Sequence, residues 1–192
     1  RRRMNPLQEA AARDFILEMA PSERLFRVVD TAAPGLCVSN LTFPRKKDGT
    51  MRPCQDGRAV NAITEPERMH VLSVREVIDS VDPTCWFYAI VDLKWGFWHI
   101  PVREEDQLKT AFYGPGGEIW AWRVMAFGWK NAPAHFQKWV AYLIDGLEGV
   151  FAYVDDLIVE AHSYEELMER LAALFDRFVK EVVAVSVRKV QV

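Results

Sequence analysis

The chain has 192 residues, which suits one large domain or two subdomains that share a core. Half of the residues are hydrophobic, no apolar run approaches the ~18 residues of a membrane span, and no signal peptide is visible. The net charge of −3 argues weakly against a nucleic-acid binder. However, residues 1–60 carry 11 Lys and Arg against 7 Asp and Glu, and the remainder carries 13 against 20. This split suits a protein that grips phosphates in one region and cations in another, although chance scatter of surface charge would give the same counts.

The N-terminal segment predicts a helix. Asn5 is a suitable N-cap, Pro6 suits the first helical position, and Gln8 stands where a capping box needs its partner. Apolar residues then recur at helical spacing until Pro21 closes the segment.

The next segments predict a hairpin, a helix and a strand. Residues 38–60 follow a strand–turn–strand pattern, with Asp48 and Gly49 at the turn and basic side chains on both sides. Residues 71–81 predict a short amphipathic helix, and residues 87–91 predict a strand of the buried type that ends at Asp92.

The second half alternates strands and helices. Ser163 is a cap for the last helix, and Glu166 takes the capping-box position. Helices that alternate with hairpins indicate an α+β domain with an antiparallel sheet. The predicted elements are strands at 108–113 and 118–125, a helix at 133–147, a split strand at 150–159, a helix at 163–179 and a last strand at 182–192.

Three cysteines, Cys37, Cys54 and Cys85, are odd in number and lack the Cys-x-x-Cys spacing of many zinc sites. We therefore expect reduced, buried thiols without a zinc site or a disulfide framework. Reduced thiols favour an intracellular setting, whose compartment the sequence leaves undefined.

Two adjacent carboxylates, Asp155 and Asp156, interrupt the apolar segment 150–159. In one continuous core strand they would point to opposite faces, and one buried charge would be costly unless it were paired. A tight hairpin with Val154 and Asp155 at its tip would instead place both acids at the exposed sheet edge. Two carboxylates at such a short distance repel each other, and they favour the binding of a hard divalent cation such as Mg²⁺. Taken alone, an Asp-Asp turn without any ligand is the commoner case.

Asp92 also ends an apolar strand, where an isolated aspartate is usually a simple cap. If that strand neighbours the hairpin, three carboxylates converge. Three acids at one sheet edge could hold two metal ions about 3.5–4 Å apart, the spacing used for in-line phosphoryl transfer.

Several sequence blocks resemble reverse transcriptases. Residues 153–156, Tyr-Val-Asp-Asp, match their Tyr-x-Asp-Asp motif. Residues 43–50 resemble the fingers hairpin of gypsy-like retrotransposon enzymes, and residues 52–61 resemble the Arg-Pro-x-x-Asp-x-Arg-x-x-Asn strand of gammaretroviral relatives. The remaining blocks match motif A and the segments that follow it, at 91–100, 105–106, 109–112 and 125–133. All the blocks come in family order with family spacing, over roughly residues 35–192.

The resemblance implies an α+β right-hand polymerase reduced to fingers and palm, with an antiparallel palm sheet packed on helices. It assigns fingers to 1–66 and 101–131 and palm to 67–100 and 132–192. Thumb, connection and RNase H segments are absent from the match, so another chain or a missing segment would supply them. A fragment, an ordered part of a longer protein and a domesticated remnant all remain open.

The resemblance also implies site roles. Asp92, Asp155 and Asp156 would be the catalytic metal ligands for two Mg²⁺ or Mn²⁺ ions. Phe97, five residues after Asp92, would be the steric gate that rejects a 2′-hydroxyl, and Lys189 would be a further phosphate contact. The residues implied to bind dNTP are Lys46, Arg52, Trp95, Gly96, Phe97 and Phe127, and those implied to contact template and primer are Arg58, Asn61, Tyr153 and Val154.

Three positions depart from the family pattern and put the fine shape of the pocket in doubt. Trp95 replaces a polar or small residue, Ala126 replaces the usual proline, and Gly57 replaces a bulky residue.

The leading hypothesis is therefore an RNA-directed DNA polymerase that extends a primer with dNTPs on an RNA or DNA template, without membrane contact. A second is a catalytically silent reverse-transcriptase-like domain that serves as a structural or RNA-binding subunit. A third is an RNA-dependent RNA polymerase, which Phe97 disfavours.

Overall fold

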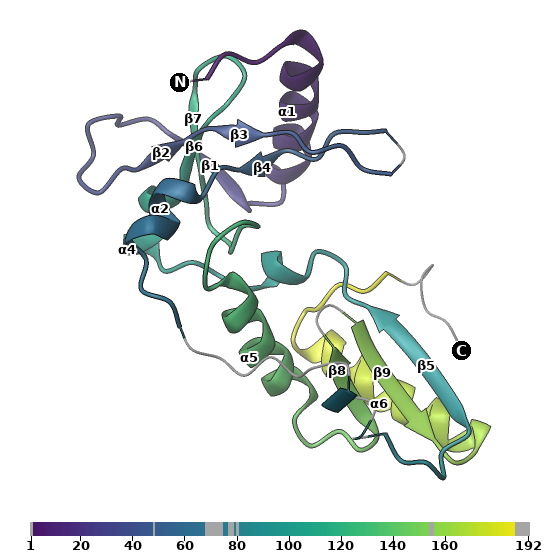
Figure 1. The fold of residues 1–192 in the computed structure, drawn as a ribbon. Coiled ribbons are helices and arrows are strands. Elements are labelled where there is room, and N and C mark those ends of the chain that lie inside the picture. Colours follow the sequence, from purple (N-terminus) through teal and green to yellow (C-terminus); the bar gives the residue numbers. More distant parts are fainter. Residues whose placement is uncertain are drawn as a thin grey trace. The chain divides into compact units, whose positions relative to one another are not determined.

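The computed structural model describes residues 2–47, 49–67, 75, 76, 79, 81–153 and 156–186 (Figure 1). The chain divides into two compact units, Arg1–Pro66 with Phe97–Ala132 and Glu67–Gly96 with Pro133–Val192. The resemblance predicts segment boundaries after residues 66, 100 and 131, and the boundaries between the two units lie after residues 66, 96 and 132. The assignment of these units as fingers and palm stays a prediction. Within the described ranges, no helix combines the length and the apolar character needed to cross a bilayer.

The first unit begins with α1 (Pro6–Met19), whose start follows the predicted capping box. The Asn5 side chain accepts a hydrogen bond from Gln8 N at 2.9 Å, and Asn5 N donates to Gln8 Oε1 at 3.1 Å. Two of the otherwise unpaired N–H groups near the helix start are thereby satisfied, which confirms the prediction.

A four-stranded sheet forms the body of the first unit. Its strands are ordered β1 (Leu25–Val28), β7 (Ile119–Trp122), β6 (Ala111–Tyr113) and β2 (Val38–Ser39). The β1–β7 and β7–β6 pairs are antiparallel, whereas β2 joins β6 in parallel, so this sheet is mixed.

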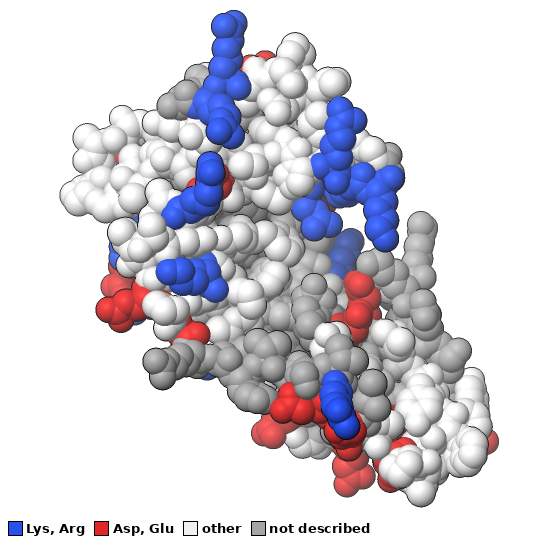
Figure 2. Space-filling model, viewed as in Figure 1, with Lys and Arg blue, Asp and Glu red and all other residues white. Residues whose placement is uncertain are grey.

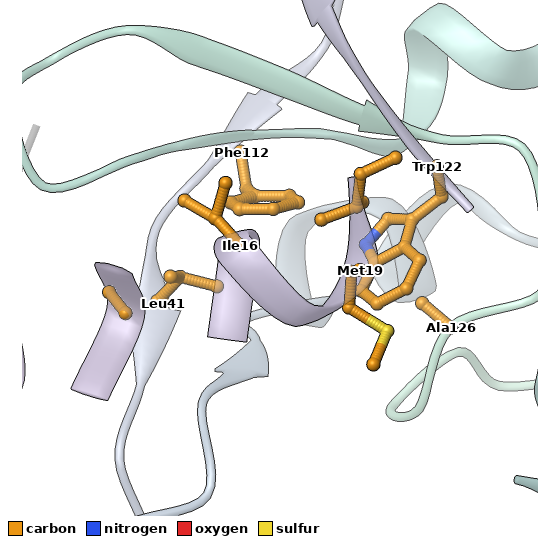
Figure 3. Close-up of a cluster of buried hydrophobic side chains, with 8 residues drawn as sticks. Ile16, Met19, Leu41, Phe112, Trp122 and Ala126 are labelled. Carbon is orange, nitrogen blue, oxygen red and sulfur yellow. The ribbon is translucent and has the colours of Figure 1, made fainter. Parts of the chain in front are cut away.

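The core of the first unit lies where α1 packs against the strands. Figure 3 shows Ile16 and Met19 of α1 beside side chains from distant segments, all of them buried. Burial of this apolar surface holds α1 on the sheet, at about 25 cal/mol per Å² removed from water. The labelled partners are Leu41, Phe112, Trp122 and Ala126.

The predicted hairpin is present. β3 (Leu41–Thr42) and β4 (Cys54–Gln55) pair in antiparallel fashion, and a bridge between Arg45 and Met51 extends the arm. Asp48 of the predicted turn lies outside the described residues.

The prediction of a strand through residue 60 is wrong, because Arg58–Ile63 form α2. Asp56 Oδ1 accepts a hydrogen bond from Arg58 N at 3.4 Å, and Gly57 O accepts one from Asn61 N at 2.8 Å. The hydrogen bond to the Asp56 side chain competes with the backbone bonds of a strand, and the bond from Asn61 N to Gly57 O is that of a helical turn.

The predicted strand 108–113 is shorter than expected, because Leu108–Thr110 form a 3-10 turn (η2) after α4 (Glu104–Gln107). The buried Thr110 hydroxyl accepts a hydrogen bond from Trp122 N at 2.8 Å, so a side chain replaces a backbone partner there. The predicted strand 118–125 is likewise reduced to β7.

The second unit contains an antiparallel sheet with the order β5 (Phe87–Asp92), β9 (Asp156–Ala161) and β8 (Val150–Tyr153). Ala89 and Val91 of β5 are buried, whereas Phe87, Tyr88 and Ile90 are exposed. The expectation of a fully buried strand is therefore wrong: among the strands that the structure describes, β5 lies at the edge of its sheet and has one covered face.

Two helices accompany this sheet, α5 (Ala132–Ile144) and α6 (Tyr164–Lys180). The buried face of α6 contains Leu167, Leu171, Leu174 and Phe178, and α6 packs on β9 and β5. Ser163 caps α6 as predicted, but Glu166 accepts from His162 N at 2.7 Å instead of completing a capping box.

Two predicted elements are only partly described. Within the helix expected at 71–81, residues 75, 76 and 79 are helical, and 71–74, 77, 78 and 80 lie outside the described residues. In the strand expected at 182–192, Val185 forms an isolated bridge with Leu93, and residues 187–192 lie outside the described part.

We predict that Gly96→Ala destabilises the chain by about 1–3 kcal/mol through overpacking. A Cβ at Gly96 would lie 2.8 Å from Cε2 of Phe136, a buried ring with little room to move. Chemical denaturation, followed by the free energy of unfolding, measures the effect.

Gly116→Ala is the matched control, because its Cβ would meet only the end of the Glu118 carboxylate at 2.6 Å. That flexible group can turn away at little cost. Equal losses in the two variants would contradict the packing role of Gly96.

Candidate active site

The register of the second unit's sheet brings two of the predicted acids together. β5 pairs with β9 so that Asp92 lies directly opposite Asp156, and β8 pairs with β9 so that Tyr153 lies opposite Asp156 on the other side. Residues that face each other in an antiparallel pair have Cα atoms about 4.5–5.5 Å apart. Asp92 is half-buried and Asp156 is exposed, so the acid pair lies where a hydrated cation can reach it.

Like charges directly opposite each other on a sheet are destabilising, and a divalent cation would remove that cost. The donors at this position are carboxylates, which fit Mg²⁺ or Mn²⁺ better than a softer metal. The other predicted residues of the hairpin tip, Val154 and Asp155, lie outside the described residues. The register leaves these two positions between the paired Tyr153 and Asp156.

The chain leaves Asp92 through a strained turn. Trp95 has a φ of +62°, a left-handed conformation that costs a non-glycine residue about 1–2 kcal/mol. Lys94 Nζ lies 3.9 Å from the centroid of the Trp95 ring, a cation–π contact that stabilises the turn. Ser186 N donates to Asp92 O at 3.0 Å, and Lys189, the predicted phosphate contact, lies outside the described residues.

Gly96 has a packing role that the sequence did not reveal. The resemblance implies that Gly96 binds dNTP, and in the structure the side chain nearest to its Cα hydrogen position is the ring of Phe136. Its backbone contact with a nucleotide stays a prediction.

In the first unit, three residues predicted to bind dNTP lie together. Phe97, in η1 (Gly96–His99), meets Phe127 edge to face with centroids 4.9 Å apart. The Arg52 guanidinium carbon lies 6.0 Å from the centroid of the Phe127 ring. A cation held beside two half-buried rings could bind a triphosphate above an apolar wall. Lys46 is exposed on the hairpin arm.

Two residues predicted to contact template and primer bind the protein itself. Asn61 Nδ2 donates to Gly128 O and its Oδ1 accepts from Lys130 N, both at 2.8 Å. Arg58 forms two side-chain hydrogen bonds with Asp56, at 2.6 and 2.7 Å, and this hydrogen bonding lowers the pKa of the Asp56 carboxyl to about 2. Asn61 therefore positions the loop that follows Phe127.

Gly57, one of the departures from the family pattern, allows this loop to come close. A Cβ at Gly57 would lie 2.8 Å from Gly128 O, a backbone atom with little freedom to retreat. Any larger residue at position 57 would push the loop away.

Comparison with known proteins identifies the family. The family model described as "Reverse transcriptase (RNA-dependent DNA polymerase)" matches residues 44–192. The chain belongs to the reverse transcriptase family. This reverse transcriptase domain is 31% identical over 140 residues to the retrovirus-related Pol polyprotein from transposon 297 of Drosophila melanogaster, covering 70% of the chain and 13% of the polyprotein.

The fold of the reverse transcriptase domain is also that of solved foamy viral enzymes. It superposes on a foamy viral protease-reverse transcriptase in complex with double-stranded DNA with a TM-score of 0.87 and 22% identity, covering all of this chain and 33% of the other. The same enzyme in complex with an RNA/DNA hybrid gives a TM-score of 0.86, also at 22% identity, with 25% of its chain covered. The domain thus spans a small part of the relatives that it matches.

We predict that Asp156→Asn raises the unfolding free energy of the metal-free domain by about 0.2–1 kcal/mol, because it removes one of two like charges that face each other. Magnesium should raise the unfolding midpoint of the parent and raise that of the variant less, because the variant has lost a ligand. Thermal unfolding in chelator and in magnesium measures both effects.

Glu169→Gln is the control, since it removes an exposed acid of α6 and should keep the parent's magnesium response. A parent that ignores magnesium, or an Asp156→Asn variant that responds as strongly as the parent, would argue against an acid-held cation.

Proposed function

We propose that this reverse transcriptase domain catalyses RNA-directed DNA polymerisation, the addition of deoxynucleotides to a primer 3′-hydroxyl. The observation that carries the proposal is the pairing of β5 with β9, which holds Asp92 opposite Asp156. Asp155 precedes Asp156 in the sequence and is proposed as the third acid. Two bound Mg²⁺ or Mn²⁺ ions would supply activation of the 3′-hydroxyl and charge stabilisation of the leaving pyrophosphate.

The chain's own residues would bind and select the nucleotide. Arg52, held beside Phe127, and Lys46 on the hairpin arm would bind the triphosphate oxygens through charge-assisted hydrogen bonds. Backbone N–H groups of Trp95 and Gly96 would add to this binding. Phe97, fixed against Phe127, would present the ring that rejects a 2′-hydroxyl.

Nucleic acid is the proposed partner. The foamy viral enzymes of the same fold are described in complex with double-stranded DNA and with an RNA/DNA hybrid. The first unit carries 15 Lys and Arg against 12 Asp and Glu, the second 9 against 15, and Figure 2 shows Lys and Arg spread over one face of the first unit. A positive surface favours contact with a phosphate backbone. Further proposed contacts are Arg58, Asn61, Tyr153, Val154 and Lys189.

We predict that Asp155→Asn and Asp156→Asn each abolish magnesium-dependent primer extension on a primed RNA template. Both variants should still bind the template–primer duplex, because neither change removes a positive charge. Extension assays with and without divalent metal, together with duplex binding by gel shift, measure the two properties separately.

Glu169→Gln again serves as the matched loss of one acid and should extend primers as the parent does. Extension by Asp155→Asn at the parent's rate would reject the catalytic assignment. A parent that binds duplex but extends no primer in magnesium or manganese would favour the silent, RNA-binding alternative.

We predict that Phe97→Val raises ribonucleotide use relative to deoxynucleotide use by about tenfold or more, which corresponds to about 1.4 kcal/mol of relieved clash. Phe26→Val, a change of the same size in the same unit, should leave this ratio unchanged. Because the readout is a ratio, a general loss of stability cannot mimic the effect. The gate assignment fails if both variants keep the parent's ratio.

A further inference from the structure

A second cluster of ligand-type side chains lies at the other end of the β5–β9 pair. Asp82 and Cys85 precede β5, and His162 follows β9. The ladder that places Asp92 opposite Asp156 also places Phe87 opposite Ala161, so the cluster and the acids are separated by the length of β5. At about 3.4 Å per residue, that separation is roughly 17 Å.

The distances within the cluster match those between the ligands of one small cation. His162 Nε2 lies 3.8 Å from Cys85 Sγ and 3.6 Å from Asp82 Oδ2, and one ligand atom from each of the three residues lies within 4.8 Å of the others. Tetrahedral zinc with bonds of about 2.0–2.3 Å would hold its ligand atoms about 3.4–3.6 Å apart. The two distances from His162 lie within a few tenths of an ångström of this spacing, and the Cys85 and Asp82 ligand atoms, which lie within 4.8 Å of each other, would need to approach by at most about 1.4 Å.

The histidine is oriented as a metal ligand would be. Glu166 Oε2 lies 3.1 Å from His162 Nδ1 and also accepts from His162 N at 2.7 Å. Arg170 in turn pairs with the other oxygen of Glu166 at 2.7 Å. A carboxylate on one ring nitrogen fixes the tautomer and turns the other nitrogen toward the metal, the arrangement seen around most metal-bound histidines.

The other two ligands are also held in place. Asp82 Oδ1 accepts from Thr84 N at 2.8 Å and from Thr84 Oγ1 at 2.6 Å, while Asp82 Oδ2 faces the histidine. Cys85 is buried, and its N–H donates to Asp82 O at 3.0 Å. A bound cation would take the place of the Cys85 thiol proton.

We propose that Asp82, Cys85 and His162 bind one divalent transition metal of the zinc class, with water as the fourth ligand. A thiolate and an imidazole select zinc, whereas the acids at the other end of the sheet select magnesium, so the two sites differ in chemistry as well as in place. The metal is structural: it joins the start of β5 to the end of β9 and fixes the register between them. The competing account is a charged His162 whose Nε2 donates to Thr84 Oγ1 at 3.1 Å and whose ring bridges the Asp82 and Glu166 carboxylates.

The test is metal content and spectroscopy of the full 192-residue chain. We expect about one zinc per chain after dialysis against metal-free buffer, and with Co²⁺ in its place a thiolate-to-cobalt charge-transfer band and tetrahedral d–d bands. Cys85→Ser and His162→Gln should each lose the bound zinc and the charge-transfer band. Asp156→Asn should keep both, which separates this site from the acids of the proposed polymerase centre.

Matched controls are Cys54→Ser, a half-buried cysteine, and His135→Gln, whose side chain is 53% exposed against 51% for His162. Both should retain zinc. A parent chain that is folded by circular dichroism but gives no thiolate–cobalt band overturns the proposal. This measurement uses the parent chain alone, so it does not depend on whether either variant folds. Zinc retention unchanged in Cys85→Ser also overturns it. A parent chain that binds zinc but extends no primer would count against the polymerase proposal alone.

Discussion

The register between β5 and β9 is the constraint on which the second unit depends. It is fixed by alternation along β5, where Ala89 and Val91 are buried beneath α6 while their neighbours face outward. A slip of one residue would turn the buried side chains outward and would also move Asp92 away from Asp156. The apolar core thus positions the acids.

The geometry around Asp92 lowers the stability of the fold at the position where the proposed function needs it. Two carboxylates face each other, and Trp95 holds a left-handed backbone conformation three residues after Asp92. Strain and like-charge contacts of this kind persist where the surrounding structure fixes them, and they cluster at functional sites. Here the covered face of the sheet, the Phe136 ring against Gly96 and the cation–π contact of Lys94 supply that support.

Features with local signals could be predicted from the residues themselves, and the meeting of Asp92 with Asp156 could be predicted from the family resemblance, whereas other contacts between distant segments could not. The caps at Asn5 and Ser163 and the hairpin before Asp156 each depend on residues close along the chain. In contrast, the role of Gly57 depends on Gly128, and that of Gly96 depends on Phe136. The expectation of buried thiols holds only for Cys85, since Cys37 is exposed and Cys54 is half-buried. The expectation against zinc rested on cysteine spacing, but Cys85 and His162 lie 77 residues apart, so no spacing rule could join them.

The central claim is that Asp92 and Asp156 share a divalent cation. Anomalous diffraction from crystals of the chain grown in manganese tests it most directly, because the metal is located independently of any assay. The account predicts an anomalous peak bound by carboxylate oxygens of both aspartates. A crystal in which manganese binds elsewhere, or in which the two side chains point apart with no peak between them, would contradict it.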